Sequence, residues 1–144
     1  MLAILPTTQI IDQDHARVGA WMQAQGAGVY RDGSTCIGLE RNGELVAGTL
    51  YDFFNGASVF ANIAIRGPIT REWLWFIFFY PFEQLGASVL LGLIAEENQK
   101  SLQLAIRFGF FVSGTVPDAD PSGPLHLVTL HRRDCRFLRS PYER

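Results

Sequence analysis

The dipeptide Asn42-Gly43 stands between two runs of residues that favour extended backbone, 36–41 and 44–51. A two-residue hairpin turn of type I′ needs a positive φ at both central positions, and Asn-Gly adopts that conformation most readily. The two runs are therefore predicted to pair as an antiparallel hairpin. A third extended run, 57–65, follows another Asn-Gly pair, so the three runs are predicted to form an antiparallel meander.

The middle of the chain has a different pattern. Residues 88–94 (SVLLGLI) form a continuous apolar run, which is typical of a strand covered on both faces. A helix is predicted before this strand, from Thr70, whose hydroxyl can cap the first turn, to about Leu85. A second helix is predicted after it, over residues 99–108, with Gly109 as its C-terminal cap. This part of the chain is thus expected to carry a buried strand between two helices.

The remaining elements complete the predicted order. A helix is expected over residues 12–25, and strands over 110–116 and 125–132, with a turn-rich loop at 118–124. Hairpin strands followed by a βαβ-like half indicate an α+β fold. The expected architecture is a mixed β-sheet, an antiparallel meander plus a βαβ half, flanked by helices. With 144 residues, the chain is expected to form a single domain, 1–144.

Composition excludes a disordered chain, since 48% of the residues are hydrophobic and 18% are charged. The net charge of −2 gives no general attraction to nucleic acid. The segment 131–144 is an exception, because it carries five arginines against Asp134 and Glu143, a local net charge of +3. Either this segment contacts an anion or it is a solvated arginine-rich tail, and the second reading is favoured.

Metal, disulfide and membrane chemistry find no support in the sequence. Cys36 and Cys135 are far apart, and the three histidines show no metal-ligand spacing. The first residues lack the basic start and the apolar run of a signal peptide. The most apolar stretch, 73–82, has ten residues, whereas a membrane span needs about twenty. A soluble, cytoplasmic protein without a bound metal is expected.

One motif occupies the helix that follows the buried strand. It reads N-x-x-S-x-x-L-x-x-R-x-G-F and comprises Asn98, Ser101, Leu104, Arg107, Gly109 and Phe110. This motif, together with the meander that precedes it, resembles the corresponding elements of the GNAT acetyltransferase superfamily. The sequence over 73–85 resembles that of small GNAT proteins of phages and prophages. The resemblance covers about residues 35–130. It implies transfer of an acyl group from acetyl-CoA to a primary amine.

The resemblance also implies a place for the cofactor. A strand that ends in a loop at a helix N-terminus presents free N–H groups to an anion such as the diphosphate of coenzyme A. The usual loop is rich in glycine, whereas this chain has Arg66-Gly67-Pro68, so arginine side chains and the Thr70 hydroxyl are expected to contact phosphate directly. The pantetheine arm is expected in a gap between the third and fourth core strands. The expected cofactor-binding residues are Ile63, Ala64, Ile65, Arg66, Thr70, Arg71, Glu72, Asn98 and Ser101.

Asn98 carries two compatible interpretations: it contacts the pantetheine arm, or it caps the following helix without any ligand. The position seven residues further on, where many family members have a catalytic tyrosine, is Ala105, and the available phenols are Tyr51 and Tyr80. A backbone N–H near Ala64 or Ile65 is expected to polarise the thioester carbonyl.

The candidate catalytic residues are acidic groups that could deprotonate the amine, and an amide that could orient it. They are Glu40, Asp52, Glu96 and, as the orienting residue, Asn62. Direct transfer is expected, without a covalent enzyme intermediate, because no activated cysteine or serine is evident.

Two alternatives stay open at this stage. The missing loop glycines and Ala105 favour a GNAT-fold protein that has lost catalysis and acts in binding or assembly. The other is a nucleic-acid-modifying enzyme of the phage type, whose arginines after His131 would hold phosphate. The expected partner is a small-molecule or peptide amine, while nucleic acid and membrane are not expected. A homodimer through exposed C-terminal strands is a further alternative.

Overall fold

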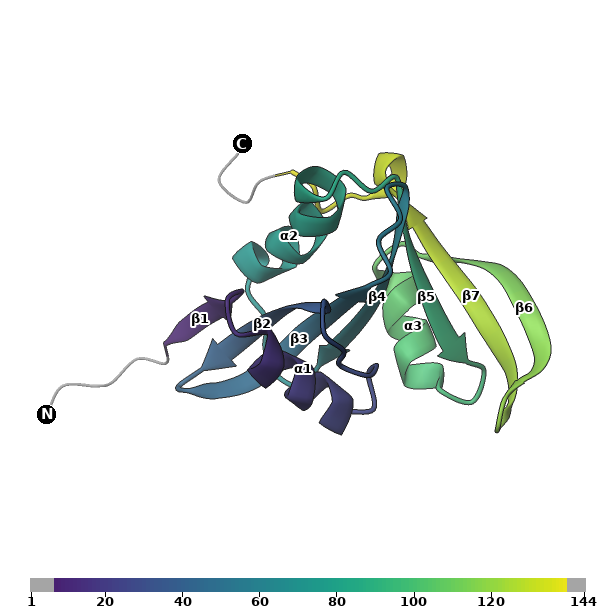
Figure 1. The fold of residues 1–144 in the computed structure, drawn as a ribbon, viewed down its shortest axis with the longest axis horizontal. Helices are drawn as coiled ribbons and strands as arrows, with labels where there is room; N and C mark the ends of the chain where they lie inside the picture. Colours follow the sequence, from purple (N-terminus) through teal and green to yellow (C-terminus); the bar gives the residue numbers. More distant parts are fainter. Residues whose placement is uncertain (1–6, 140–144) are drawn as a thin grey trace, which may run out of the picture.

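The structure, a computed structural model, describes residues 7–139. Within that range the strands form one seven-stranded sheet in the order β1-β2-β3-β4-β5-β7-β6, which fans out from β1 to β6 in Figure 1. The strands are β1 (Thr8–Ile11), β2 (Thr35–Arg41), β3 (Glu44–Asp52), β4 (Ser58–Ile65), β5 (Val89–Ala95), β6 (Phe111–Asp120) and β7 (Gly123–His131). The helices are α1 (His15–Ala24), α2 (Arg71–Phe79) and α3 (Gln99–Arg107), with a π-helical turn at Tyr80–Gln84 and a 3-10 turn at Arg132–Asp134. The α+β class and the mixed sheet predicted from the sequence are confirmed.

The meander is confirmed with its turn. β2, β3 and β4 pair antiparallel, and the turn between β2 and β3 has φ 51° at Asn42 and 85° at Gly43. Both values are positive, as the type I′ geometry requires. The only parallel pairing in the described sheet joins β4 to β5.

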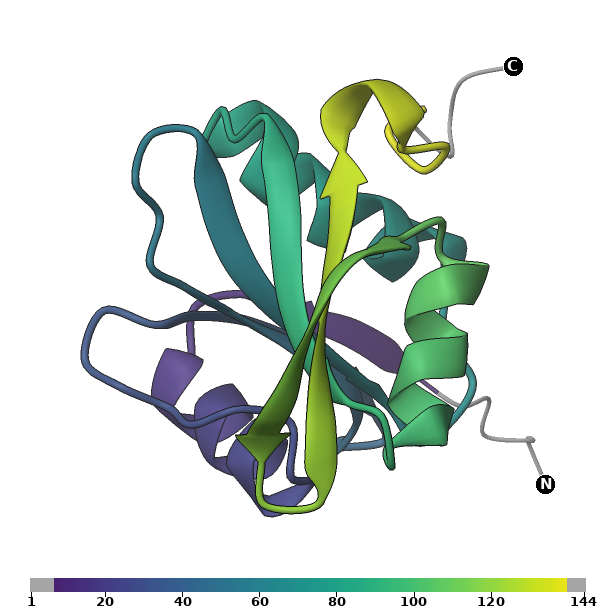
Figure 2. The ribbon, with the colours of Figure 1, turned by 90° about the vertical axis from the view of Figure 1, so that its right-hand side faces the viewer.

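Helices cover both faces of the sheet, with α1 on one side and α3 on the other in Figure 2. Val18 and Met22 of α1 pack on the first face, against Leu50 and its neighbours. Glycines at 38 and 48 allow this close approach, since a Cβ there would lie 2.9 Å from Val18 Cγ2 and from Met22 Sδ, respectively. The larger core cluster lies on the other face and contains residues from both α2 and α3.

Two elements differ from the expectation. The short strand β1 was not predicted; it is defined by its pairing with β2, a long-range contact without a local sequence signal. The loop expected at 118–124 is instead the end of a hairpin, because β6 continues to Asp120 and β7 starts at Gly123. Proline and aspartate are rare in central strands, but β6 is an edge strand, where they are tolerated.

The C-terminal segment packs on the core. The Phe137 ring stacks on Phe78, with centroids 5.0 Å apart, and Trp75 Nε1 donates to the Leu138 carbonyl at 3.3 Å. The arginines of the described segment are exposed, as a solvated tail would have them, but Phe137 and Leu138 are half-buried against the core, so the segment up to Leu138 is not a free tail. Residues 140–144 lie outside the described range. No helix of the described chain is long and apolar enough to cross a membrane.

Candidate active site

The parallel pair β4–β5 separates soon after it forms. The two strands are paired only from Ser58–Phe60 to Val89–Leu91, and their later residues have no ladder partner across the gap. Gly92 stands where β5 departs from β4. A gap between the third and fourth core strands was predicted, and this pairing confirms it.

Backbone groups of β4 face this gap. The Arg66 N–H donates to the Val46 carbonyl, and in an antiparallel ladder alternate residues point toward the same neighbour. Ala64 therefore points at β3, whereas Ile65 and Ile63 point into the gap. Of the two N–H groups predicted to polarise a carbonyl, only that of Ile65 has this orientation.

Two adjoining cavities occupy the gap. The first, the Asp120 cavity, has a volume of about 250 Å³ and is lined by β4, β5, α3 and the β6–β7 hairpin, including Ala61, Asn62, Gly92, Leu93, Ala105, Asp120 and Leu125. The second, the basic cavity, has about 470 Å³ and is lined by Ile65, Arg66, Lys100, Gln103 and Arg107, among others. Both are also lined by Gly26, Ala27, Ile63, Asn98, Ser101 and Leu104. The two cavities thus form one continuous site.

Charge divides this site into two ends. Arg66, Lys100 and Arg107 line the basic cavity, and no carboxylate is among its described lining residues. Asp120 is the one ionisable side chain among the described residues that line the other cavity. One end therefore suits an anion and the other a cation.

Asn98 caps α3 at the junction of the two cavities. Its side-chain oxygen accepts a hydrogen bond from the Ser101 N–H at 3.3 Å, and both residues line both cavities. The capping interpretation is confirmed, and the cap also places the amide at the site. Gly109 ends α3 with φ 101°, as predicted.

The structure brings together some of the predicted cofactor residues and not others. Ile63, Ala64, Ile65, Arg66, Asn98 and Ser101 all line the basic cavity. Thr70, Arg71 and Glu72 line neither cavity, because the chain runs from Ile65 along β3. Pro68 reaches Arg41, whose guanidinium lies 3.5 Å from the Pro68 carbonyl. The Thr70 hydroxyl accepts from the Trp73 N–H and caps α2.

Comparison with protein-family models gives no match, and comparison with curated protein sequences gives none either. Solved structures do match. The yncA protein of Salmonella typhimurium, solved with its cofactor acetyl-CoA, is 16% identical, with a TM-score of 0.64 over 94% of this chain and 96% of that one. The spermidine/spermine N-acetyltransferase SpeG of Vibrio cholerae is 11% identical, with a TM-score of 0.69 over 88% and 96%. The N-acetyltransferase PseH of Campylobacter jejuni, in complex with acetyl coenzyme A, is 13% identical, with a TM-score of 0.56 over 89% and 99%.

The chain has the GNAT acetyltransferase fold. At these identities the likeness concerns the fold. The chemistry has to be argued from the side chains that this chain places in the gap of its GNAT sheet.

Two of the predicted carboxylates are engaged by basic side chains outside the gap. Glu40 lies 2.7 Å from the Arg17 guanidinium, and Glu96 lies 3.6 Å from His126 Nε2. Neither lines the cavities. Asn62, in contrast, does line the Asp120 cavity.

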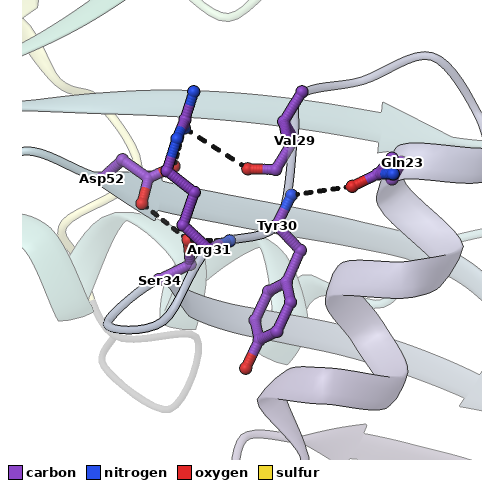
Figure 3. Close-up of polar contacts among 6 residues, drawn as sticks. All are labelled: Gln23, Val29, Tyr30, Arg31, Ser34 and Asp52. Carbon is purple, nitrogen blue, oxygen red and sulfur yellow. Dashed lines mark hydrogen bonds and ion pairs between the residues drawn. The ribbon is translucent and has the colours of Figure 1, made fainter.

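Asp52 is held in a network at the end of β3, shown in Figure 3. It accepts hydrogen bonds from the Ser34 hydroxyl at 2.6 Å and from Arg31 at 3.4 Å, and Arg31 also contacts the Val29 carbonyl. Tyr30, which lies between Val29 and Arg31 in the chain, donates its N–H to the Gln23 side chain. Asp52 therefore anchors the segment between α1 and β2, and it does not line the cavities.

The phenols of this GNAT sheet are also committed elsewhere. The Tyr51 hydroxyl donates to the Ile77 carbonyl inside the core, and burial raises the pKa of this phenol above its usual value. The Tyr80 hydroxyl lies 3.1 Å from Thr35 Oγ1. Ala105 lines the Asp120 cavity, so a methyl group stands at the position where a tyrosine is usual.

Four residues of the site were not predicted as functional: Gly92, Lys100, Arg107 and Asp120. Arg107 belongs to the motif that carried the resemblance, and Lys100 follows Asn98 on the same helix. Gly92 interrupts an otherwise apolar strand, which is a signal for close approach of another group. Asp120 gave no signal because the segment that contains it, 118–124, was predicted to be a loop.

Proposed function

We propose that this protein is an N-acetyltransferase that moves the acetyl group of acetyl-CoA to a primary amine. The observation that carries the proposal is the division of charge along one gap in a GNAT sheet. A highly anionic cofactor suits the basic cavity, and a cationic acceptor suits the Asp120 cavity. The thioester would then lie where the two cavities join, near Asn98.

The pantetheine arm is proposed to lie between β4 and β5 in the manner of an added strand. Unpaired backbone groups at a sheet edge bind an extended chain through main-chain hydrogen bonds. Ile63 offers such groups, and Ile65 offers its N–H, since the Ile65 carbonyl accepts a hydrogen bond from the Arg66 guanidinium. The Ile65 N–H is the one we assign to the thioester carbonyl. Polarisation of that oxygen favours attack on the carbonyl carbon.

The phosphates are proposed to contact Arg66, Lys100 and Arg107 rather than the start of α2. Guanidinium and ammonium groups form charge-assisted hydrogen bonds with phosphate. The first turn of α3, which begins after Asn98, adds the positive end of a helix dipole. This placement replaces the one expected at Thr70–Glu72, since those residues line neither cavity.

Transfer is proposed to be direct. The nitrogen lone pair of the neutral amine attacks the thioester carbonyl carbon and the C–S bond breaks. The nitrogen loses one of its two protons and the leaving thiolate takes up one, so the products are the N-acetylated amine and free CoA thiol. A thiol intermediate is disfavoured, because burial raises the pKa of Cys36 to about 12 and also raises that of Cys135. Neither cysteine lines the cavities.

The second candidate function, binding without transfer, is favoured by Ala105, which supplies no proton to the leaving thiolate. Release of free CoA thiol from acetyl-CoA separates the two candidates. An acetyltransferase releases thiol faster when primary amines are added, while a binding protein takes up acetyl-CoA and leaves it intact.

The double substitution Lys100→Gln and Arg107→Gln is expected to weaken acetyl-CoA binding by about a hundredfold or more. Each change removes a charged donor, and a charge-assisted hydrogen bond contributes roughly 1.5–3 kcal/mol when it is well formed. Calorimetric titration measures the dissociation constant. S-acetylpantetheine, which lacks the phosphates of the nucleotide, should bind the variant and the parent protein equally.

Arg71→Gln is the control at the start of α2, where it removes one of the positive charges that the sequence predicted to contact phosphate. It is expected to leave acetyl-CoA binding unchanged. If Arg71→Gln weakens binding as much as the double substitution does, the phosphates lie at α2 and the assignment to the basic cavity is wrong.

A further inference from the structure

Asp120 is the acidic residue that lines the cavity beside the proposed site of transfer. The acids expected from the sequence, Glu40, Asp52 and Glu96, each contact an arginine, a histidine or a hydroxyl outside the gap. Asp120 lines the cavity together with Asn62 of β4. No cation lines this cavity among the described residues, so the carboxylate has no internal counter-ion there.

An irregularity of β6 directs this side chain. The pairing of β6 with β7 passes from Val116–Leu125 to Asp120–Gly123, so β6 has two more residues than its partner in this interval. Asp118, within the bulged part, has φ 59°, a left-handed value that aspartate tolerates better than most residues. Bulges re-aim side chains and occur frequently beside functional sites. In a regular edge strand, successive side chains would continue to alternate between the two faces of the sheet. The irregularity interrupts this alternation just before Asp120, which lines the cavity.

The hairpin turn holds this carboxylate ionised. Asp120 accepts hydrogen bonds from the Ser122 N–H at 3.0 Å and from the Ser122 hydroxyl at 2.5 Å. Both donors favour the charged form, and they lower the pKa of Asp120. Both bonds are made through the same carboxylate oxygen, Oδ2, which leaves Oδ1 free for another donor. An ionised group with a free oxygen is suited to bind a cation and poorly suited to remove its proton.

We infer that Asp120 binds the ammonium group of the acceptor amine and thereby selects cationic primary amines over neutral acceptors. The inference rests on the proposed function, which supplies the acetyl donor. Asn62 lines the same cavity, and its amide oxygen can accept a hydrogen bond from the same nitrogen once it is neutral. Asp120 is thus a specificity-determining residue, and the proton leaves the amine to solvent.

Asp120→Asn tests the inference, because asparagine keeps the acceptor oxygen for Ser122 and removes only the charge. The probes are n-butylamine, 1,4-diaminobutane and 2-phenylethylamine, with 1-butanol as the neutral match for the first. Binding is measured by ligand-detected NMR, with and without acetyl-CoA. We expect at least one amine to bind the parent protein, about tenfold or more weaker binding to Asp120→Asn, and no binding of 1-butanol.

Asp118→Asn is the matched control, since it makes the same change two residues away on the same hairpin. It is expected to bind the amines like the parent protein. Equal losses of amine affinity in both variants would mean that the net charge of the hairpin, and not Asp120 itself, attracts the amines, which would contradict the inference. An absence of binding by all three amines would refute it as well. If the amines bind as expected while acetyl-CoA does not bind, the result supports the assignment of Asp120 to an amine site and contradicts the proposed acetyl transfer.

Discussion

Replacing Phe78 by alanine is expected to lower the free energy of unfolding by about 3–5 kcal/mol, the range for a fully buried phenylalanine. The Phe78 side chain is completely buried on α2. Its ring stacks on Phe137, with an angle of 14° between the planes, and meets the edge of Phe108 at a centroid distance of 6.0 Å. One substitution therefore loosens α2, the end of α3 and the C-terminal segment together. Urea unfolding followed by circular dichroism measures the change.

Phe111→Ala is the control for this prediction. Its ring is 61% exposed on the edge strand β6, so its removal should change the free energy of unfolding by less than about 0.5 kcal/mol. A loss at Phe78 no larger than that at Phe111 would mean that the C-terminal segment does not pack on α2 in solution.

Gly92→Val is expected to weaken acetyl-CoA binding by about a hundredfold or more, which corresponds to about 2.7 kcal/mol. A Cβ at this position would lie 3.0 Å from Val128 Cγ2 and 3.6 Å from the Ala61 carbonyl oxygen. A branched side chain would therefore fill the gap between β4 and β5 that the pantetheine arm needs. Overpacking against Val128 also costs stability, roughly 1–3 kcal/mol, so the titration is run at a temperature where unfolding curves show the variant folded.

Gly114→Val separates the two effects. It introduces the same side chain on β6, at a glycine with no atom within 4 Å of the added Cβ. Acetyl-CoA binding should be unchanged. Normal acetyl-CoA binding by folded Gly92→Val would contradict the placement of the cofactor in this gap.

The parts of the fold that follow local rules could be predicted from the sequence. The Asn42-Gly43 turn, the Thr70 cap of α2 and the Gly109 end of α3 depend on a few neighbouring residues, and all three are confirmed. Strand β1 and the burial of Phe137 depend on contacts with distant residues. Such contacts leave no periodic signal in the segment itself.

In the candidate site, too, the features that depend on local sequence could be predicted and those that depend on distant contacts could not. The gap and the position of Asn98 came from element order and a motif on one helix. The sequence favours a phosphate end at the start of α2, and we propose the basic cavity instead, because a strand–loop–helix pattern does not reveal where the loop leads. Here Arg66 continues the pairing with β3 and carries the start of α2 away from the gap. Asp120 depends on a bulge, and a bulge is visible only when the register of both strands is known.

Calorimetric titration of the parent protein with acetyl-CoA tests the central proposal most directly. The gap, with its basic cavity, predicts saturable binding of one acetyl-CoA per chain, weaker binding of S-acetylpantetheine, and a rise in thermal midpoint with ligand concentration. The absence of heat and of any thermal shift at millimolar acetyl-CoA, with a protein that unfolds cooperatively, would contradict it.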